Sequence, residues 1–579
     1  MARSNDAVAA ALQEIADLLA ITGGDPYRVR SYEKAARSVA LYHREVADLD
    51  LKGLMAIPAV GDHTARRILE LRGTGRIADL EELRAKVPDG LRSLLDVPGL
   101  GPRHAEQVYR ELGISSMPEL LDALHEHRLQ HLKGWGARSE ESLVAAIHGM
   151  QRSGGRIPLG VALDLAEQVV ASLEAMPGVE RAAFAGSLRR MCETIGDVDV
   201  LVASEDPLAV MSAFTSLPLV SRVLAKGPTK SSVVSTRGVQ VDVRVVAPQA
   251  WGPALMYFTG SKAHNVRIRE LAVRRGMKLS EYGLYRADDD APVSTGSESE
   301  IYACLELPYI PPTLREDRGE VEAALEGRLP HLVDVSDLRG DLHLHTNLTD
   351  GLAGLEDMVT AAKARGYSYC AITDHAPLLY MQRMTKEKAI EQRAAIRKLE
   401  TSSGITVLHG SELNIQPDGS LDWDDEFLAG FDVLVASIHS HFHMPRDEMT
   451  TRLIRAMEHP SVNVIGHPSA RSLGRRPPID FDVDAVFAAA ARTGTALEIN
   501  SFPDRLDLND QLARRARDFG VHFAIDTDSH AVIHLANIRF GVATAQRAWI
   551  DPAEVINCRP LAELRRFLKK APLRRAVGG

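Results

Sequence analysis

Apolar residues near the start of the chain recur at the spacing of amphipathic helices. Val8, Leu12 and Ile15 fall on one side of a helix, because side chains three and four positions apart are neighbours on a helical surface. The run Gly-Gly-Asp-Pro at residues 23–26 interrupts this pattern, since glycine and proline are unfavourable inside a helix. The periodicity resumes beyond the break, so residues 5–47 predict amphipathic helices.

A short turn followed by a helix then occurs three times, at residues 57–61, 97–101 and 132–136. Glycine lets the backbone turn tightly and come close to another molecule, and the N–H groups that open the next helix can point at an anion. The three stretches resemble helix-hairpin-helix modules, which bind DNA phosphates without reading bases. Ordinary packing between helices is the alternative. The glycines expected at DNA are Gly61, Gly99, Gly101, Gly134 and Gly136.

The middle of the chain contains two strand-like runs in which acidic residues alternate with valines. Asp197 and Asp199 lie in one run and Asp242 in the other. Side chains two apart share one face of a strand, and neighbouring carboxylates repel each other unless a cation lies between them. Mg²⁺ binds one or two carboxylates together with substrate phosphates. Residues 186–190, Gly-Ser-Leu-Arg-Arg, offer N–H groups, a hydroxyl and positive charge to a phosphate. An acidic turn beside a strand is the alternative.

From residue 341 onward, strand-like and helix-like stretches alternate, and polar residues follow the strands. His343 and His345 share one face of the first strand, which is the alternation that a metal needs. A single histidine is more often structural, but polar residues recur here strand after strand. A (β/α) barrel places its active site at the carboxyl ends of its strands. The later strand ends contain residues 373–375, 410–412, 436–439, 465–468 and 526–530.

Composition and charge limit the other possibilities. A chain of 579 residues, 45% apolar and 25% charged, should form about three or four globular domains. Its four separated cysteines indicate a reducing compartment and argue against a disulfide framework. We find neither a signal peptide nor a run of the ~20 apolar residues that a membrane helix requires, and we expect a cytoplasmic, nucleoid-associated protein. With a net charge of −10, contacts to nucleic acid must come from local basic patches.

Residues 256–261, Met-Tyr-Phe-Thr-Gly-Ser, complete a resemblance to the X family of DNA polymerases over residues 5–316. The resemblance implies a palm in which Asp197, Asp199 and Asp242 are catalytic and bind two ions, Mg²⁺ or Mn²⁺. Core packing is the alternative role for Tyr257 and Phe258. By the same resemblance, the residues that bind the dNTP are Arg156, Gly186, Ser187, Arg190, Gly196, Tyr257, Phe258, Gly260 and Asn265.

Several further positions follow or depart from this family. Arg28 and Tyr32 match positions that hold a DNA 5′-phosphate, with a solvated helix face as the alternative, and Arg269 is expected at DNA. Ala59 replaces the first glycine of the first hairpin, so that its backbone should approach DNA less closely. Arg67 stands where the family has the lyase lysine. Because a guanidinium stays protonated and forms no Schiff base, we expect no lyase activity from this residue.

Residues 339 to about 575 resemble a PHP (polymerase and histidinol phosphatase) domain. The resemblance implies up to three ions, Mn²⁺ or Zn²⁺. Arg471 follows one ligand closely and could hold a phosphate, whereas His409, His441 and His443 do not fit the ligand pattern. By resemblance the metal ligands are His343, His345, Asp350, His375, Glu412, His439, His467, Asp528 and His530.

These observations predict a multidomain chain with an all-α helix-hairpin-helix region, an α+β nucleotidyltransferase palm with a thumb-like subdomain, and a distorted (β/α) barrel. The expected boundaries are 1–85 and 86–155 for the helical domains, 156–250 for the palm, 251–318 for the thumb, 319–338 for a linker and 339–579 for the PHP domain. We expect a monomeric DNA polymerase and 3′–5′ exonuclease that repairs gapped or primer-template DNA with 5′-phosphate ends, away from any membrane. A small-molecule phosphatase and a silent DNA-end scaffold remain the alternatives.

Overall fold

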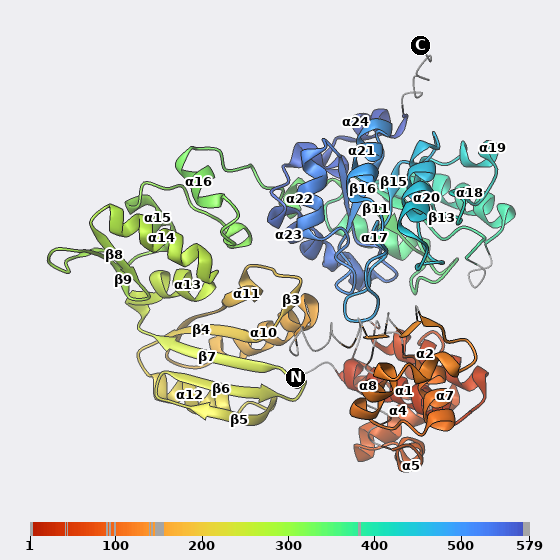
Figure 1. Ribbon diagram of the computed structural model, residues 1–579, viewed down its shortest axis with the longest axis horizontal. Coiled ribbons are helices and arrows are strands. Elements are labelled where there is room, and N and C mark those ends of the chain that lie inside the picture. Colours follow the sequence, from red (N-terminus) through yellow and green to blue (C-terminus); the bar gives the residue numbers. More distant parts are fainter. Residues whose placement is uncertain are drawn as a thin grey trace. The chain divides into compact units, whose positions relative to one another are not determined.

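The computed structural model describes residues 4–40, 42, 45–88, 91, 94–95, 97, 100–137, 139–140, 143–144, 147, 156–379 and 384–570. The chain divides into two compact units (Figure 1). One comprises residues 1–155 with 472–477, and the other comprises residues 156–471 and 478–579. Among the described residues, no helix combines the length and the apolar character needed to cross a membrane.

The regular elements described between residues 4 and 147 of the first unit are all helices, as the sequence predicts. Its core contains Leu12, Ile15 and Val39, which come from the amphipathic faces of the first two helices. Pro26 opens the second helix, a position where its missing N–H is not needed. The helices are α1 (Ser4–Ile21), α2 (Pro26–Ala40), η1 (Val46–Asp48), α3 (Leu51–Met55), α4 (Asp62–Thr74), α5 (Ala78–Lys86), α7 (Pro102–Leu112), α8 (Met117–His125) and η2 (Arg128–His131).

The palm is a five-stranded sheet in the order β2-β4-β7-β6-β5. Its central pair, β4 and β7, runs parallel, and the other pairs run antiparallel. Its elements are β1 (Ile157–Pro158), α10 (Leu159–Glu174), β2 (Val179–Phe184), α11 (Gly186–Arg189), β3 (Thr194–Ile195), β4 (Val198–Ser204), α12 (Pro207–Thr215), β5 (Val220–Lys226), β6 (Lys230–Ser235) and β7 (Gln240–Val246).

The thumb adds helices and a three-stranded antiparallel sheet in the order β10-β9-β8. The segment expected to be a linker after residue 318 is packed into the structure, because Glu320 is fully buried against His264 and Val333 joins the core of the PHP domain. The elements are η3 (Pro248–Ala250), α13 (Trp251–Thr259), α14 (Lys262–Arg274), β8 (Met277–Ser280), β9 (Gly283–Arg286), β10 (Pro292–Ser294), α15 (Glu298–Cys304), η4 (Pro312–Leu314) and α16 (Glu320–Leu325).

The PHP domain contains seven parallel strands that pair in sequence order from β11 to β17. A bridge between Leu344 and Ser529 brings the two edges together, so the sheet is a nearly closed barrel. The strands are almost wholly buried, as expected where helices cover a parallel sheet. The strands are β11 (Gly340–Leu344), β12 (Tyr369–Ile372), β13 (Thr406–Asn414), β14 (Val433–Ser437), β15 (Val464–Ile465), β16 (Ala496–Asn500) and β17 (Phe523–Asp526).

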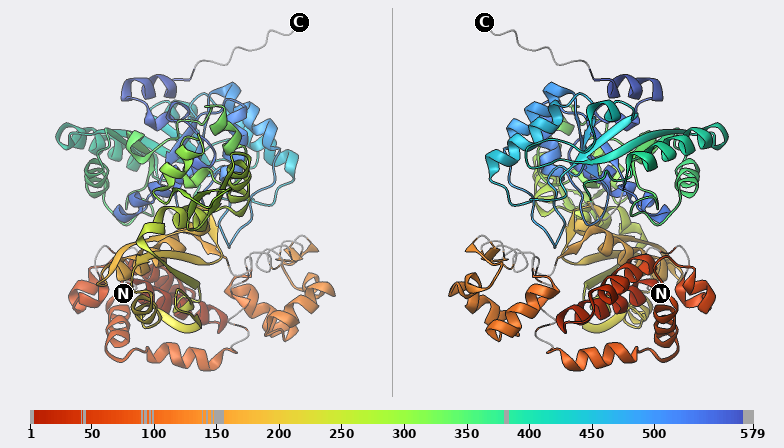
Figure 2. Two further views of the ribbon diagram at one scale, coloured as in Figure 1. Left: turned by 90° about the vertical axis from the view of Figure 1, so that its left-hand side faces the viewer. Right: turned by 90° about the vertical axis from the view of Figure 1, so that its right-hand side faces the viewer.

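Helices of the PHP domain surround this barrel: in Figure 1, α22 and α23 lie to its left and α18 and α20 to its right, and Figure 2 shows the domain from two other sides. This layout leaves the carboxyl ends of the strands for the polar residues that follow them. The helices are η5 (Val335–Asp337), α17 (Leu355–Ala364), α18 (Lys386–Ser403), α19 (Asp425–Leu428), α20 (Arg446–Glu458), α21 (Val483–Thr493), α22 (Asp510–Asp518), η7 (Val532–Asn537), α23 (Ile538–Arg547), η8 (Pro552–Glu554), η9 (Ile556–Cys558) and α24 (Leu561–Leu568).

Two candidate active sites

Three carboxylates meet where β4 and β7 run side by side. Asp199 lies directly opposite Asp242 in the register of these strands, and Asp197 immediately precedes β4. Asp242 is buried, Asp199 is partly buried and Asp197 is exposed. The three predicted metal-binding residues of the palm thus lie close together near the starts of β4 and β7, in the middle of the sheet, where Asp197 is exposed to solvent.

The electrostatics of this cluster are those of a cation site. Burial raises the pKa of Asp199 to about 6, and the negative charges of Asp197 and Asp242 add to the shift. Burial acts on Asp242 as well, but hydrogen bonds donated by Lys230 (2.7 Å) and Gln240 (2.9 Å) hold its pKa below the usual value. Lys230 and Arg190 lower the pKa of Asp199 but do not offset these effects, so the cluster of three acidic groups is short of positive charge.

Gly186 begins the short helix α11 directly against this cluster. Its φ of +57° is in the left-handed region, and a Cβ at this position would lie 2.3 Å from Oδ2 of Asp199. Only glycine satisfies both conditions. The backbone of Gly186 and of the adjoining Ser187 is therefore beside the carboxylates, as a phosphate-binding loop requires.

Arg190 connects this loop to the thumb. Its Nη1 donates a hydrogen bond to the carbonyl oxygen of Thr259 at 2.6 Å, and its Nε donates to Oε1 of Glu316 at 3.0 Å. Gly260 has φ +70°, and a Cβ there would lie 3.2 Å from Nη1 of Arg190. The predicted triphosphate-binding residue therefore contacts the segment predicted to hold the sugar.

The two aromatic residues of that segment are only partly buried. Tyr257 and Phe258 meet edge to face with ring centroids 5.1 Å apart, and the Arg244 guanidinium lies 4.6 Å from the Phe258 ring. Asn265 donates a hydrogen bond to the backbone oxygen of Tyr257 at 2.7 Å. These contacts fix the segment while leaving parts of both rings accessible.

Arg156 and Gly196 lie together in front of β4. The Arg156 Nε donates to the hydroxyl of Thr194 at 3.0 Å, and a Cβ on Gly196 would lie 3.2 Å from its Nη1. Arg156 is exposed, so its guanidinium is available next to Gly196 and the acidic residue that follows it. This geometry suits the triphosphate contact predicted for Arg156.

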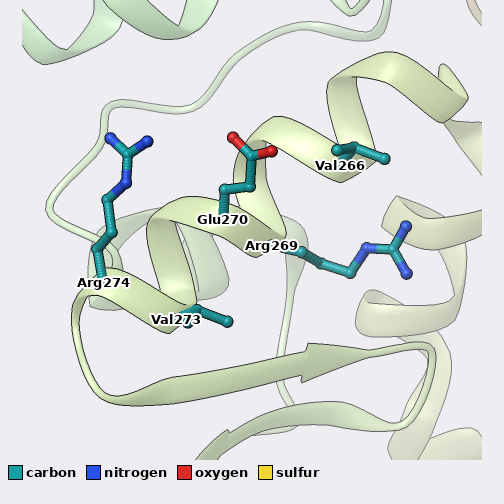
Figure 3. Close-up of a pocket in the computed structure, with 5 residues that line it drawn as sticks. All are labelled: Val266, Arg269, Glu270, Val273 and Arg274. Carbon is teal, nitrogen blue, oxygen red and sulfur yellow. The ribbon is translucent and has the colours of Figure 1, made fainter.

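The thumb helix α14 presents a stripe of residues around a shallow hollow (Figure 3). Arg269 and Arg274 project from it together with Val266, Glu270 and Val273. These positions recur at intervals of three and four, so they share one face of the helix. Arg269, which is expected at DNA, lies in this stripe one turn beyond Asn265.

Two of the predicted DNA-binding glycines lie directly before helices. Gly61 precedes α4 and Gly101 precedes α7, and neither has a side-chain cap on the following N–H groups. A Cβ on either glycine, or on Gly136, would meet no atom within 4 Å. The N–H groups at these helix starts are therefore open to an anion.

The hairpin turns show what backbone conformation Ala59, which replaces a glycine of the family pattern, has to adopt. Gly134 has φ +89°, and Ala59, at the same place in the first turn, has φ +62°. The turn thus needs a left-handed residue, and Ala59 adopts a conformation that is uncommon for any residue other than glycine. Gly99, in the second turn, lies outside the described residues.

The predicted 5′-phosphate site of the helical unit contains an exposed Arg28 and a buried Tyr32. The Tyr32 hydroxyl lies 3.2 Å from Nδ1 of His63. Arg67 is held between Glu70 (2.7 Å) and Asp79 (2.6 Å). Two carboxylates therefore engage its guanidinium. A guanidinium is in any case chemically unable to serve as a Schiff-base nucleophile.

Of the nine predicted ligands of the PHP domain, the six histidines surround the other three, which are Glu412 and two aspartates. Among the described residues, three groups place their ligand atoms within 4.8 Å of one another. His467 joins them through its Nε2, which lies 3.0 Å from Oε1 of Glu412. The groups are His345, Asp350, His375 and His530; His343, His345 and Asp528; and His375, Glu412 and His439.

Each oxygen of Glu412 faces a different set of imidazoles. Oε1 lies 3.2 Å from Nε2 of His439 and 3.0 Å from that of His467. Oε2 lies 2.9 Å from Nδ1 of His375 and 3.6 Å from Nε2 of His345. This is the arrangement of a carboxylate that two ions can share.

The two aspartates complete the cluster from opposite sides. Asp528 Oδ1 lies 3.3 Å from Nε2 of His345. Asp350 Oδ2 lies 3.4 Å from Nε2 of His375, and its Oδ1 lies 3.4 Å from Nε2 of His530. This spacing would let Asp350, His375 and His530, with His345, hold one of the up to three ions that the resemblance implies.

These residues fit metal ions. Buried ligand atoms in the cluster have no hydrogen-bond partner, including Nε2 of His343, both ring nitrogens of His345, Oδ1 of Asp350 and Nδ1 of His375. Such groups normally find a partner. Burial, with the neighbouring histidines, lowers the pKa of His345 to about 4, whereas Glu412 and Asp350 outweigh burial and raise the pKa of His375 to about 10. Imidazole and carboxylate donors suit zinc or manganese.

Comparisons with known proteins agree with this division of the chain. Four family models match: a helix-hairpin-helix domain at residues 3–77, a SAM-like helix-hairpin-helix tandem at 91–148, a DNA polymerase beta thumb at 254–316 and a PHP domain at 341–502. The DNA polymerase/3′-5′ exonuclease PolX of Bacillus subtilis is 35% identical over 563 residues, which cover 96% of this chain and 98% of that protein. The chain belongs to the PolX family of DNA polymerases.

Other relatives resemble parts of this PolX chain. DNA polymerase lambda of rat is 26% identical over 324 residues, which cover 51% of the chain and 53% of lambda. A probable phosphatase of Shewanella sediminis is 30% identical over 241 residues, which cover 40% of the chain and 93% of that protein. The resemblances to the X family and to PHP domains are therefore confirmed.

Supporting residues of the PHP site were missed in the sequence. Glu498 Oε1 accepts a hydrogen bond from Nδ1 of His343 at 2.7 Å, and Oε2 accepts one from the backbone N–H of His467 at 2.5 Å. Asn414 Oδ1 lies 2.7 Å from Nδ1 of His439. Such partners orient the ligand rings. In the sequence, Glu498 could have been noticed as an acidic residue inside the otherwise apolar strand-like run 496–500.

The arginine nearest to the cluster is Arg505 rather than Arg471. Arg505 Nε lies 3.6 Å from Oδ2 of Asp528. Arg471 instead donates to the backbone oxygens of Arg505 (2.9 Å) and Leu506 (2.5 Å) and pairs with Glu193 (2.8 Å). Arg471 therefore supports the loop that presents Arg505, and the phosphate contact expected of Arg471 fits Arg505 better.

Proposed function

We propose that this PolX chain fills short gaps in DNA during base excision repair and removes nucleotides from 3′ ends with its PHP domain. The observation that carries the proposal is the presence of two complete sites in one chain. The palm has three carboxylates under a glycine loop, and the barrel has nine predicted ligand residues, with eight of them gathered around Glu412. The name of the Bacillus subtilis relative, which combines the two activities, supports the pairing.

In the palm, Asp197, Asp199 and Asp242 would hold two ions, Mg²⁺ or Mn²⁺. Such ions offset the charge that develops on a transferring phosphoryl group. Gly186 and Ser187 offer backbone N–H groups and a hydroxyl to the triphosphate, and Arg156 and Arg190 supply positive charge.

The remaining polymerase residues place the other parts of the substrate. The segment containing Tyr257, Phe258 and Gly260 bounds the space for the deoxyribose, and Asn265 reaches the new base pair. The primer 3′-hydroxyl then attacks the α-phosphate of the dNTP in line with the departing pyrophosphate. Holding both reactants in this geometry accounts for much of the rate in such reactions.

In the PHP domain, the nine ligand residues would hold up to three ions, Mn²⁺ or Zn²⁺. Clustered ions of this kind supply a hydroxide near neutral pH for phosphodiester hydrolysis. Glu498 and Asn414 keep His343 and His439 in the orientation that faces the cluster. Arg505, beside Asp528, is placed to contact the phosphate of the terminal nucleotide.

DNA is the substrate that both sites share in this proposal. The open helix starts at Gly61, Gly101 and Gly136 would bind backbone phosphates without base specificity, and Arg28 with Tyr32 would hold a 5′-phosphate across the gap. We propose a monomer that acts on the chromosome in the cytoplasm. Binding to gapped DNA should then weaken steeply as salt rises, which a titration at two salt concentrations checks.

The test uses the full-length protein and a duplex with a one-nucleotide gap, a labelled primer and a 5′-phosphate. With dNTPs the primer should grow by one nucleotide, and without dNTPs in Mn²⁺ it should become shorter. Primer growth without any shortening would contradict the nuclease. Release of phosphate from small monoesters without DNA shortening would favour the phosphatase alternative, to which the similarity with probable phosphatases points. Binding without either reaction would indicate a scaffold.

A further inference from the structure

An arginine of the PHP domain reaches the predicted nucleotide site of the palm. Arg547 is the last residue of α23, and the palm and the PHP domain belong to the same compact unit. Its Nη1 donates hydrogen bonds to the backbone oxygen of Arg190 at 2.8 Å and to Oε1 of Glu316 at 2.9 Å. Only 7% of the side chain is exposed. The surroundings of Arg190 therefore include a PHP residue.

Glu316 lies between two guanidinium groups. The oxygen that accepts from Arg547 also accepts from Nε of Arg190 at 3.0 Å. Glu316 is 17% exposed and Arg190 is 13% exposed, so water screens these charges weakly. Although burial favours its protonated form, Arg190 and Arg547 hold the pKa of Glu316 below its usual value. One negative charge is shared by two positive charges.

Asp510 holds the guanidinium of Arg547 in place. Its Nε and Nη2 lie 3.1 and 3.0 Å from Oδ2 of Asp510, the first residue of α22. Asp510 also accepts a hydrogen bond from Arg318 at 2.9 Å. A guanidinium held by both edges has little freedom left to lose, which makes it an effective support for a neighbouring group.

The sharing of Glu316 determines how much positive charge Arg190 can offer. If Arg547 were absent, Glu316 would pair with Arg190 alone and neutralise it more fully. The backbone of Arg190 would also lose a hydrogen-bond donor. Both changes would weaken the attraction of Arg190 for a triphosphate, since a charge-assisted contact depends on an available charge and on orientation.

We propose that Arg547 is a positioning residue of the polymerase site, through which the PHP domain keeps Arg190 oriented and charged for the incoming nucleotide. The inference rests on the proposed polymerase function and goes beyond it by assigning a part of the nucleotide site to the nuclease domain. It predicts that nucleotide binding and the contact between α23 and the palm are energetically linked.

The experiment compares gap filling by the wild type and by Arg547→Gln. The KM for the dNTP should rise about tenfold, the size expected for losing a hydrogen bond to a charged group. The value of kcat should change much less, because the lost interaction serves binding rather than the chemical step. Arg547→Lys should recover part of the KM, since it keeps the charge and loses the forked contacts.

A second substitution separates positioning from a general structural effect. Glu316→Gln should lower the KM, because Arg190 is then no longer neutralised. The double variant Arg547→Gln with Glu316→Gln should have a KM closer to the wild type than Arg547→Gln alone. As a matched control, Arg515→Gln removes an arginine of α22 whose partner is Asp484 (2.8 and 2.7 Å), and it should not change the KM.

The inference is overturned if Arg547→Gln has the wild-type KM, if the double variant is no better than the single one, or if kcat and the nuclease rate fall in parallel with the KM effect. Dialysis of labelled dNTP against the protein with gapped DNA in Ca²⁺ measures binding without turnover. A wild type that binds dNTP with this dependence on Arg547 but adds no nucleotide would contradict the proposed function and leave the linkage standing. A wild type that binds no dNTP would overturn both.

Discussion

The two active sites use carboxylates in opposite surroundings. In the palm, Asp197 is exposed, Asp199 is partly buried, and Lys230 and Arg190 are the cations that act on Asp199. In the PHP domain, Glu412 is almost fully buried and is enclosed by imidazoles, with Glu498 holding one of them from behind. The palm site is therefore open and short of positive charge, whereas the PHP site is closed and already surrounded by its ligands.

This contrast indicates how each site acquires its metal ions. Hard ions that keep part of their water and bind substrate phosphates suit an open carboxylate edge, so the palm should gain its ions together with the nucleotide. A site of buried imidazoles with oriented partners binds ions before the substrate arrives.

Replacing Glu412 by alanine should cause the largest change in the PHP site. Each carboxylate oxygen faces a different set of histidines, so two ions should be lost together. The 3′–5′ exonuclease rate should fall by about 1,000-fold, because several kcal/mol of transition-state stabilisation depend on such ions. Release of nucleotides from a labelled single-stranded 3′ end in Mn²⁺ measures the effect, and the metal content of the purified protein should fall as well.

The control for this variant is His441→Ala. His441 is exposed, and its Nδ1 lies 3.0 Å from Oγ of the neighbouring Ser440. It should leave both the nuclease rate and the metal content unchanged. Gap filling by the Glu412 variant serves as the folding control. Wild-type digestion by Glu412→Ala would show that the cluster is not the nuclease site.

Replacing Asp242 by alanine should lower the rate of nucleotide addition by a similar factor of about 1,000, since two-metal sites depend on each carboxylate. The nuclease should keep its rate, because the PHP cluster contains no palm residue. In contrast to Glu412→Ala, the metal content of the isolated protein should change little if the palm gains its ions with the nucleotide. Primer extension near the wild-type rate would refute the catalytic assignment, and a loss of tightly bound metal would refute the contrast between the sites.

Replacing Glu498 by glutamine should have a smaller effect. The change keeps the size of the side chain but weakens its hold on His343. Metal affinity or nuclease rate should fall by about 10- to 100-fold, as is usual for residues that orient metal ligands. Titration of the metal-free protein with Mn²⁺ measures the affinity directly. An unchanged affinity together with an unchanged rate would mean that the PHP site does not depend on its enclosing partners.

The two sites differ in which of their residues the sequence alone could predict. The ligand series of the PHP domain could be found because its residues lie near or beyond the carboxyl ends of successive strands, and the palm carboxylates could be found because they alternate with valines. The roles of Glu498 and Asn414 could not be predicted, because they depend on which ring nitrogen each residue faces across the barrel. Arg471 and Arg505 illustrate the same limit, since both are arginines in loops and only the folded chain shows which one faces Asp528.

The packing between domains was equally beyond the sequence. Residues 319–338 have the charge and length of a linker, yet Glu320 pairs with His264 and Val333 enters the PHP core. Arg547 lies in an ordinary amphipathic helix, and its contact with Arg190 joins positions 357 residues apart. Pairings of this range follow from the tertiary arrangement and leave no local periodicity to detect.

The smallest effect concerns the stability of the palm without metal. Because the pKa of Asp199 is raised to about 6, the folded state holds a proton there more tightly than the unfolded state does. The stability that protonated Asp199 contributes is therefore lost as the pH rises from the ordinary pKa of an aspartate to about 6. Above that pH, the charged Asp199 is fully exposed to repulsion from Asp197 and Asp242. Asp199→Asn should stabilise the palm at pH 7.5 by roughly 1 kcal/mol, the scale of repulsion between two nearby charges in water.

Hydrogen exchange of residues 198–204 in the presence of a chelator measures this local stability, which whole-chain melting of several domains does not resolve. The gain from Asp199→Asn should shrink as the pH falls from 7.5 towards 5, where the wild-type carboxyl is itself neutral. Asp242→Asn should have the opposite sign, because the pKa of Asp242 is lowered and Lys230 would lose its partner. If both variants shift exchange in the same direction, the palm is not short of positive charge, and the contrast with the enclosed PHP site loses its electrostatic basis.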